Sequence, residues 1–135
     1  MRVALGRDAR GHKLRSGDHR TPEGEYRVVG AARPGRHHLF LRIDYPSRRD
    51  AEVALAEGRL PRSDYERILR AHADGMPPPD DTAIGGNLGF HGEGDRWRGD
   101  SRHLDWTYGC IAVTDDEIEL LVSRVDPGAS VWIHP

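Results

Sequence analysis

The sequence is poor in cysteine and has no long apolar run. With one Cys among 135 residues, it excludes an internal disulfide and a cysteine-rich zinc site. No apolar stretch approaches the ~20 residues of a transmembrane helix, and the polar N-terminus is unlike a signal peptide. We therefore expect no transmembrane segment, and the single thiol is a structural residue, a lone metal ligand or a nucleophile.

An excess of charge of one sign is also missing. The 20 basic and 22 acidic residues give a net charge of −2, which provides no field that would attract nucleic acid or an anionic membrane. The composition, 36% apolar and 31% charged with 16 Gly and 9 Pro, is typical of a loop-rich globular protein. We expect a single domain over residues 1–135 with one core of modest size.

Short strands rich in β-branched, aromatic and aliphatic residues are predicted along the chain. The Arg33-Pro34-Gly35-Arg36 segment predicts a hairpin turn between the second and third of them, and Gly17–Gly24 predicts a shaped turn. The predicted strands cover residues 2–5, 26–31, 37–43, 84–91, 110–113 and 130–133.

Helices are predicted over residues 50–57, from Ser63 to about residue 72, and from Thr114 to about residue 125. Ser63 and Thr114 each stand three residues before a Glu, which is the pattern of a capping box. The first two helices belong to the segment 51–79, which is either a flap over the site or surface filling.

The one thiol, Cys110, follows Gly109, which lets the chain turn sharply and leaves room beside the sulfur. A free thiol is mostly protonated near neutral pH, and a nearby imidazole can remove its proton. His91 is our candidate for that base. Both residues could instead have purely structural roles. Cys110 would then be a small side chain buried in the core, and His91 would cap the end of a strand.

A two-part motif resembles a known family. His91-Gly92, followed after a loop by Thr107-x-Gly109-Cys110, resembles the His-Gly and Ser/Thr-x-Gly-Cys signature of YkuD-type L,D-transpeptidases. Other segments similar to this family are Leu5-Gly6, Gly11-His12-Lys13, the Gly17–Tyr26 turn and Asp44-Tyr45-Pro46.

The resemblance implies a fold that is mainly β with peripheral helices, a YkuD-like β-sandwich. The chain begins near what resembles the family's second strand, so we expect either that upstream sequence has been lost or that the sheet is trimmed.

For the site, the resemblance implies that Cys110 is the nucleophile and that His91 is the general base and acid. The Gly92 carbonyl would orient the imidazole, and backbone amides near Gly109 and Cys110 would stabilise the oxyanion. No cofactor and no metal is expected.

Four further residues are expected to shape the site or to contact substrate: Thr107, Tyr108, Arg20 and Trp106. Trp106 either lines the cleft or packs in the core. Tyr108 stands where many family members have His, and Ala112 where Arg or Asn is frequent. These departures leave the substrate, and not the nucleophile, in question.

In this family the thiolate attacks the carbonyl that precedes the terminal D-amino acid of a peptidoglycan stem tetrapeptide, and a side-chain amine of a second stem resolves the thioester. The resemblance therefore implies donor and acceptor stem peptides as partners and a place in the periplasm or cell wall, with no role for nucleic acid.

Three alternatives stay open. Water in place of the acceptor amine would give an L,D-carboxypeptidase or amidase of the same fold. A metal protein could use His91, His103 and Cys110, although no regular ligand spacing is present. The third alternative is a catalytically silent wall-binding module.

Overall fold

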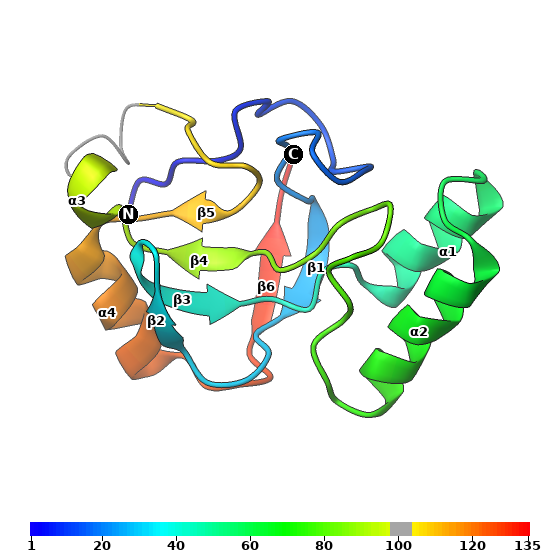
Figure 1. Cartoon of the computed structure of the whole chain (residues 1–135). Coiled ribbons are helices and arrows are strands. Elements are labelled where there is room, and N and C mark those ends of the chain that lie inside the picture. The colour runs from blue at the N-terminus through cyan, green and yellow to red at the C-terminus, as the bar shows by residue number, and fades with distance from the viewer. Residues whose placement is uncertain (98–103) are drawn as a thin grey trace.

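The computed structural model describes residues 1–97 and 104–135 and contains two small sheets with helices at their periphery (Figure 1). The first sheet pairs β1 (Gly24–Arg27) with β6 (Ser130–Ile133). The second has the order β2 (Arg33–Gly35), β3 (His38–Arg42), β4 (Gly89–His91), β5 (Ile111–Ala112). The mainly β fold with peripheral helices is as predicted.

The helices lie on opposite sides of the sheets (Figure 1). α1 (Arg48–Ala56) and α2 (Arg62–Ala73) pack on each other at one side, while the short α3 (Gly94–Trp97) and α4 (Asp115–Arg124) lie at the other. In the part of the chain described, no helix has the length and apolar character to cross a membrane.

The main core lies between the two sheets. Strand alternation buries Tyr26 while Glu25 and Arg27 stay exposed, and Val28, in the next inward position, is buried as well. One cluster contains Tyr26, Ile43, Tyr45 and Leu88, a second contains Val28, Leu41, Val113 and Ile118, and a separate one joins α1 to α2.

The pairing of β4 with β5 positions the two parts of the motif. These strands are parallel, with Phe90 opposite Ile111 and His91 opposite Ala112. The predicted first strand, residues 2–5, is reduced to one isolated bridge from Ala4 to Ala112, and a second bridge joins Gly6, just after it, to Thr107. The first residues of the chain therefore run beside β5 and the turn that precedes it.

The predicted antiparallel pairing of residues 26–31 with 37–43 is present only in part, through a bridge between Val28 and Ile43 and a hydrogen bond from the Val29 amide to the Arg42 carbonyl, and the predicted turn between them is wrong. β1 pairs with β6, and Arg33–Gly35 form a strand of their own, β2, antiparallel to β3. Pro34 is compatible with this position because β2 lies at the edge of its sheet, where a missing backbone N–H costs little. The turn itself falls at Arg36 and His37.

Helix starts were predicted with mixed success. The capping box at Thr114 is present, and α4 buries Ile118 as predicted. The capping box predicted at Ser63 is wrong. The N-cap residue of α2 is Pro61, whose ring fixes φ and whose side chain makes no capping hydrogen bond, so Ser63 already lies inside the helix. A capping box with Asp50 at Ser47 starts α1 and was missed.

Candidate active site

His91 and Cys110 line one cavity of about 720 Å³. His91 ends β4, and its partner Ala112 lies two residues after Cys110 on the neighbouring strand. Because side chains two positions apart along a strand point to the same face, this register directs both groups toward one side of the sheet. The other residues of the lining are Arg7, Arg33, Pro34, Gly35, Arg36, His37, Phe40, Asn87, Asp95, Trp106, Thr107 and Tyr108.

The His91 imidazole is buried and oriented by its own loop. Its Nδ1 lies 2.6 Å from the carbonyl oxygen of Gly92, and because a carbonyl only accepts, Nδ1 carries the proton. Nε2 is then the basic nitrogen. Burial lowers the pKa of His91, as does the nearby His37, while the bond to Gly92 opposes them. We expect a neutral imidazole at neutral pH.

Two aromatic rings enclose the His91 ring. His37 stacks on it with centroids 4.9 Å apart, and Trp106 meets it edge-on at 5.4 Å. Trp106 also contacts His37 edge-on at 5.2 Å and is buried, so it is both a packing residue and part of the cavity wall. Sequence reasoning missed His37, since nothing in the sequence distinguishes it among eight histidines.

The Gly92 loop is held between α4 and the β2–β3 hairpin. The Asp115 carboxylate, at the start of α4, accepts hydrogen bonds from the amides of Glu93 (3.0 Å) and Gly94 (3.1 Å). A Cβ on Gly92 would overlap this carboxylate and approach the His37 carbonyl oxygen to 2.9 Å. Gly92 is therefore the residue that lets these elements close on the loop.

The Cys110 side chain is half-buried and packs against the core cluster that contains Tyr26, Tyr45 and Leu88. Burial raises the pKa of Cys110 to about 11, although a hydrogen bond from the Gly89 amide and the charge of Lys13 act in the opposite direction. We expect a resting pair of neutral thiol and neutral imidazole. An attack by sulfur then requires transfer of its proton as the new bond forms.

The Thr107 hydroxyl is used inside the turn that carries Cys110. It donates to the Cys110 carbonyl oxygen at 2.6 Å and accepts from the Gly109 amide at 3.1 Å. Thr107 is also buried, which favours a site-shaping role over substrate contact, the two roles that the sequence left open. Because the Gly109 amide already has an acceptor, the Cys110 amide is the remaining candidate of the two for an oxyanion donor.

Gly109 is required by both its backbone angle and its surroundings. Its φ is +137°, and a Cβ there would lie 2.7 Å from the Arg20 carbonyl oxygen. Gly109→Ala is expected to lower the free energy of unfolding by about 2 to 4 kcal/mol, from strain and overlap together, measured by chemical denaturation. Gly17→Ala is the matched control, since Gly17 has a φ of +77° and nothing within 4 Å. Equal losses in both variants would show that the contact with Arg20 carries no energy.

Arg20 lies outside the lining of the cavity. Its guanidinium Nε donates to Asp8 Oδ2 at 2.9 Å, and only its backbone reaches the turn at Gly109. The predicted substrate contact by Arg20 therefore has no support in the geometry. Asp18 holds this segment, because its carboxylate accepts from Lys13 Nζ and from the amides of Leu14, Arg15 and Arg20. The shaped turn was predicted correctly.

Tyr108 lies exposed at the rim of the cavity. The Arg7 guanidinium carbon is 5.0 Å from the centroid of its ring, and the His19 ring is also 5.0 Å away. These contacts leave the Tyr108 ring accessible to a ligand, as its predicted role requires.

The two helices of the 51–79 segment do not cover this cavity. No described residue between positions 41 and 86 lines it. These helices border a different cavity, of about 960 Å³, which shares no lining residue with the first. The flap interpretation is therefore not supported.

A metal site was one of the alternatives. Among the residues that the structure describes, no group of three or more His, Cys, Asp or Glu side chains is placed to hold a metal ion. His103, which that alternative included, lies outside the described residues.

Comparison with known proteins gives one family and a set of similar structures. The sequence matches the family model YkuD, described as the L,D-transpeptidase catalytic domain, over residues 1–133. A search of curated proteins gives no significant match.

Among solved structures, the helical cell shape determining protein Pgp2 from Campylobacter jejuni is similar in its K307A mutant (TM-score 0.62, 21% identity) and in a second structure (0.59, 22%). Bd1075 from Bdellovibrio bacteriovorus follows (0.54, 16%). These similarities cover 96%, 96% and 97% of this chain but 35%, 36% and 36% of the others, so the chain spans about a third of their length. At such identities the structures show a shared fold alone.

Proposed function

Because the chain belongs to the YkuD family of L,D-transpeptidase catalytic domains, we propose that it is a cysteine-dependent L,D-transpeptidase acting on peptidoglycan stem peptides. The observation that carries this proposal is the common cavity of Cys110 and His91, in which the Gly92 carbonyl leaves the imidazole Nε2 as the basic nitrogen. The family acts on peptidoglycan, which supplies the substrate class.

The reaction follows from these two groups. As Cys110 Sγ attacks the carbonyl carbon before the terminal D-amino acid, His91 Nε2 takes the thiol proton. The C–N bond then breaks, and His91 returns the proton to the leaving amine, which leaves an acyl-thioester on Cys110. An amine of a second stem attacks the thioester and gives a proton to His91. The C–S bond then breaks, and His91 passes this proton to the sulfur, which regenerates the thiol.

The surrounding turn would support the charge that develops on the carbonyl oxygen. The Cys110 amide is the proposed donor, held in place because Thr107 fixes the carbonyl of the same residue. Trp106 and His37 cover the imidazole, and its burial together with the charge of His37 favours the neutral form that can act as a base.

Product analysis tests the proposal. The purified protein and Cys110→Ala are incubated with tetrapeptide muropeptides, and products are identified by mass. Cross-linked dimers that depend on Cys110 are expected. Tripeptides without dimers would assign an L,D-carboxypeptidase instead, and the absence of any product would assign a silent binding module. The family also supports a cell-wall or periplasmic place of action, which we include in the proposal.

His37 is proposed as a positioning residue for His91. His37→Phe keeps a ring stacked on His91 but removes the second imidazole, whose charge lowers the pKa of His91. The acid limb of kcat/KM is therefore expected to move to higher pH, measured in a pH–rate profile. His38→Phe is the control, since exposed His38 contacts Glu119 and not His91. An unchanged acid limb in His37→Phe, or an equal shift in both variants, would contradict this role.

A further inference from the structure

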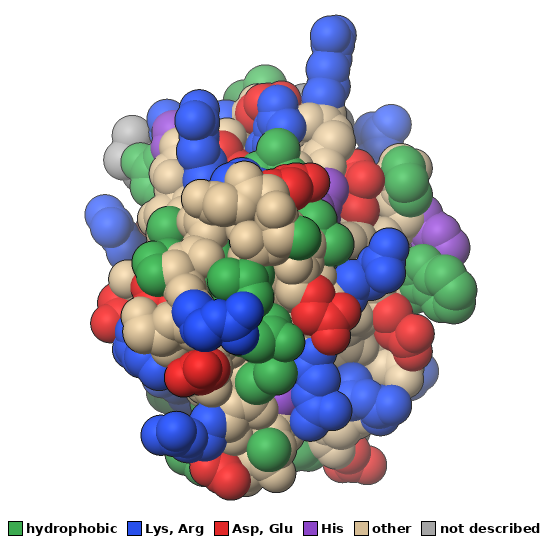
Figure 2. Space-filling model, turned by 90° about the vertical axis from the view of Figure 1, so that its right-hand side faces the viewer, with side chains coloured by type: hydrophobic (Ala, Val, Ile, Leu, Met, Phe, Trp, Pro, Cys, Tyr) green, Lys and Arg blue, Asp and Glu red, His purple; other side chains and the backbone are tan. Residues whose placement is uncertain are grey.

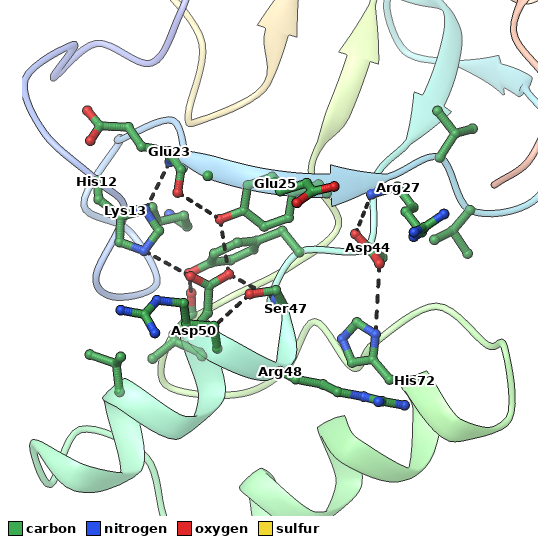
Figure 3. A pocket seen from close by; sticks show the side chains of 18 of the residues that line it. His12, Lys13, Glu23, Glu25, Arg27, Asp44, Ser47, Arg48, Asp50 and His72 are labelled. Atoms are coloured by element: carbon green, nitrogen blue, oxygen red, sulfur yellow. Dashed lines mark hydrogen bonds and ion pairs between the residues drawn. The ribbon is translucent and has the colours of Figure 1, made fainter. Parts of the chain in front are cut away.

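A second cavity, of about 960 Å³, lies between β1 and the α1–α2 pair (Figure 3). Its volume is within the range of about 300 to 1,000 Å³ of small-molecule and peptide sites. We call it the β1–α1 groove. It shares no lining residue with the cavity of Cys110 and His91, so the proposed reaction leaves it without a role.

One end of the β1–α1 groove is fixed by a partly buried hydrogen-bond network. The Nε2 of His12 lies 3.1 Å from Asp50 Oδ1, and the Tyr26 hydroxyl donates to Asp50 Oδ2 at 3.0 Å. The Glu23 amide donates to His12 Nδ1 at 2.9 Å. These groups satisfy one another and tie the N-terminal segment, β1 and the start of α1 together. They form a preshaped wall and are not themselves free to bind a ligand.

Charged side chains of opposite sign border this groove from its two walls. Glu25 lies in β1 and Glu23 directly before it, whereas Arg48 and Arg49 come from the first turn of α1. Figure 3 shows Glu23, Glu25 and Arg48. None of these four side chains has a hydrogen bond or ion pair with another residue within 1–97 or 104–135. Basic and acidic side chains also alternate over this side of the molecule (Figure 2).

Arg48 and Arg49 are not expected to stabilise α1. Arg48 and Arg49 occupy the first turn, where the helix dipole favours negative charge, and Asp50 already meets that preference. Both side chains are exposed. Their position instead suits the recognition of a carboxylate, which a guanidinium binds in a bidentate manner.

The edge of β1 adds backbone groups to the groove. Arg27 directs its N–H to Asp44 Oδ1 (2.7 Å) and accepts from the Asp44 amide (2.9 Å), on the side away from β6. In an antiparallel pair, alternate residues direct their backbone groups to the same side, so Glu25 directs its N–H and C=O the same way. No other described residue bonds to them. Because residues 27–29 on this side are already bonded to residues 42–44, the backbone of Glu25 is the part of β1 with which an extended peptide can pair.

We propose that the β1–α1 groove binds an extended peptide that carries both a free carboxylate and a free amine. The carboxylate binds Arg48 and Arg49, the amine binds Glu23 and Glu25, and the peptide backbone pairs with Glu25. Stem peptides of peptidoglycan have both groups, so the identity of the ligand rests on the proposed function. The groove would hold a second region of the wall polymer, apart from the reacting carbonyl.

The test is an NMR titration of Cys110→Ala, which cannot be acylated at position 110, with a stem tetrapeptide as the probe. Amide shifts are expected in β1 and at the start of α1. The double charge reversal Arg48→Glu with Arg49→Glu is expected to weaken binding about tenfold. Glu25→Gln, which keeps the shape of the strand residue, is expected to weaken it about threefold.

The matched control is Arg62→Glu with Arg70→Glu on α2. It changes the net charge equally, at exposed positions that do not line the groove, and is expected to alter affinity less than twofold. Probes with amidated carboxylates or an acetylated amine are each expected to bind more weakly than the unmodified tetrapeptide.

Three results would overturn the inference: shifts confined to residues around His91 and Cys110, equal loss of affinity in both double variants, or equal affinity for the unmodified and modified probes. The product assay on the native protein separates this failure from that of the proposed function. Cys110-dependent products without groove binding refute the groove alone, whereas groove binding without any product refutes the enzyme alone.

Discussion

Cys110→Ala is expected to lower product formation from tetrapeptide muropeptides by on the order of 10³-fold or more, because the substitution removes the atom that forms the thioester. The neighbouring hydroxyl of Thr107 does not replace it, since that group is hydrogen-bonded to the backbone on both sides. The rate is measured by chromatography and mass analysis of the released products.

The same substitution is expected to leave the fold intact. Cys110 is only half-buried, and loss of one sulfur atom costs about 1 kcal/mol of unfolding free energy, measured by chemical denaturation. Cys110→Ser keeps the shape of the side chain and provides a second inactive variant. If Cys110→Ala kept more than about a tenth of the wild-type rate, the nucleophile would be a different group.

The second large effect is the pH dependence of the thiol. Since the pKa of Cys110 is raised to about 11, the thiolate fraction at pH 8 is about 10²-fold below that of an ordinary cysteine. Alkylation by iodoacetamide in the absence of substrate is therefore expected to be slow at pH 8 and to keep rising through pH 10. A rate that levels off near pH 6 to 7 would instead show a preformed thiolate and imidazolium pair.

The pH dependence of the catalysed reaction should differ from that of alkylation, because it is set by the protonation of His91 at low pH. His91 acts as a base only when neutral, and burial lowers its pKa below 6.5, so its proton is bound only in more acid solution. kcat/KM is therefore expected to stay constant between pH 7 and about 6.5 and to fall at lower pH. His91→Gln should lower kcat/KM by about 10² to 10⁴-fold and remove this limb. An acid limb centred above pH 7 would contradict a neutral resting imidazole.

Cys110 and His91, the proposed chemical centre of the site, could be named from the sequence because of local signals and of the resemblance of their two-part motif to the YkuD family. The chain has one cysteine, it follows a glycine, and a His-Gly pair ends an earlier apolar segment. α4 was predicted from local signals alone, since the capping box at Thr114 and the buried position of Ile118 lie within a few residues of each other. Such patterns require no knowledge of distant pairing.

The strand pairing was not accessible in this way. β1 pairs with β6, and Tyr26 lies opposite Val131, more than a hundred positions away. Local turn residues favoured pairing with the nearer segment, which the structure keeps only between Val28 and Ile43. Burial of Tyr26 and Val131 in one core cluster favours β6 as the partner along the whole of β1, and no local signal predicts this pairing.

The misplaced turn, predicted at residues 33–36 and found at residues 36–37, explains why His37 was missed. Its ring meets His91 only because β2 and β3 bring the loop between them against the Gly92 segment, and that loop was assigned wrongly. The sequence left the role of Thr107 open between shaping the site and contacting substrate. A hydroxyl beside a nucleophile suits substrate binding equally well until its two backbone contacts are known.

For the 51–79 segment, composition predicted that helices form but not where they pack. Helix formers and an apolar face predicted α1 and α2, but no local feature states which surface they cover. They pack on each other around Ile68 and border the β1–α1 groove, away from Cys110.

The acyl-enzyme bond is observed most directly by intact mass spectrometry of the protein after reaction with a carbapenem, whose strained carbonyl acylates a reactive thiol. We predict one adduct per chain, located by peptide mapping on the fragment that contains Cys110, formed much more slowly in His91→Gln and absent in Cys110→Ala. An unmodified wild-type protein, or an adduct that persists in Cys110→Ala, would contradict the assignment of Cys110 as the nucleophile.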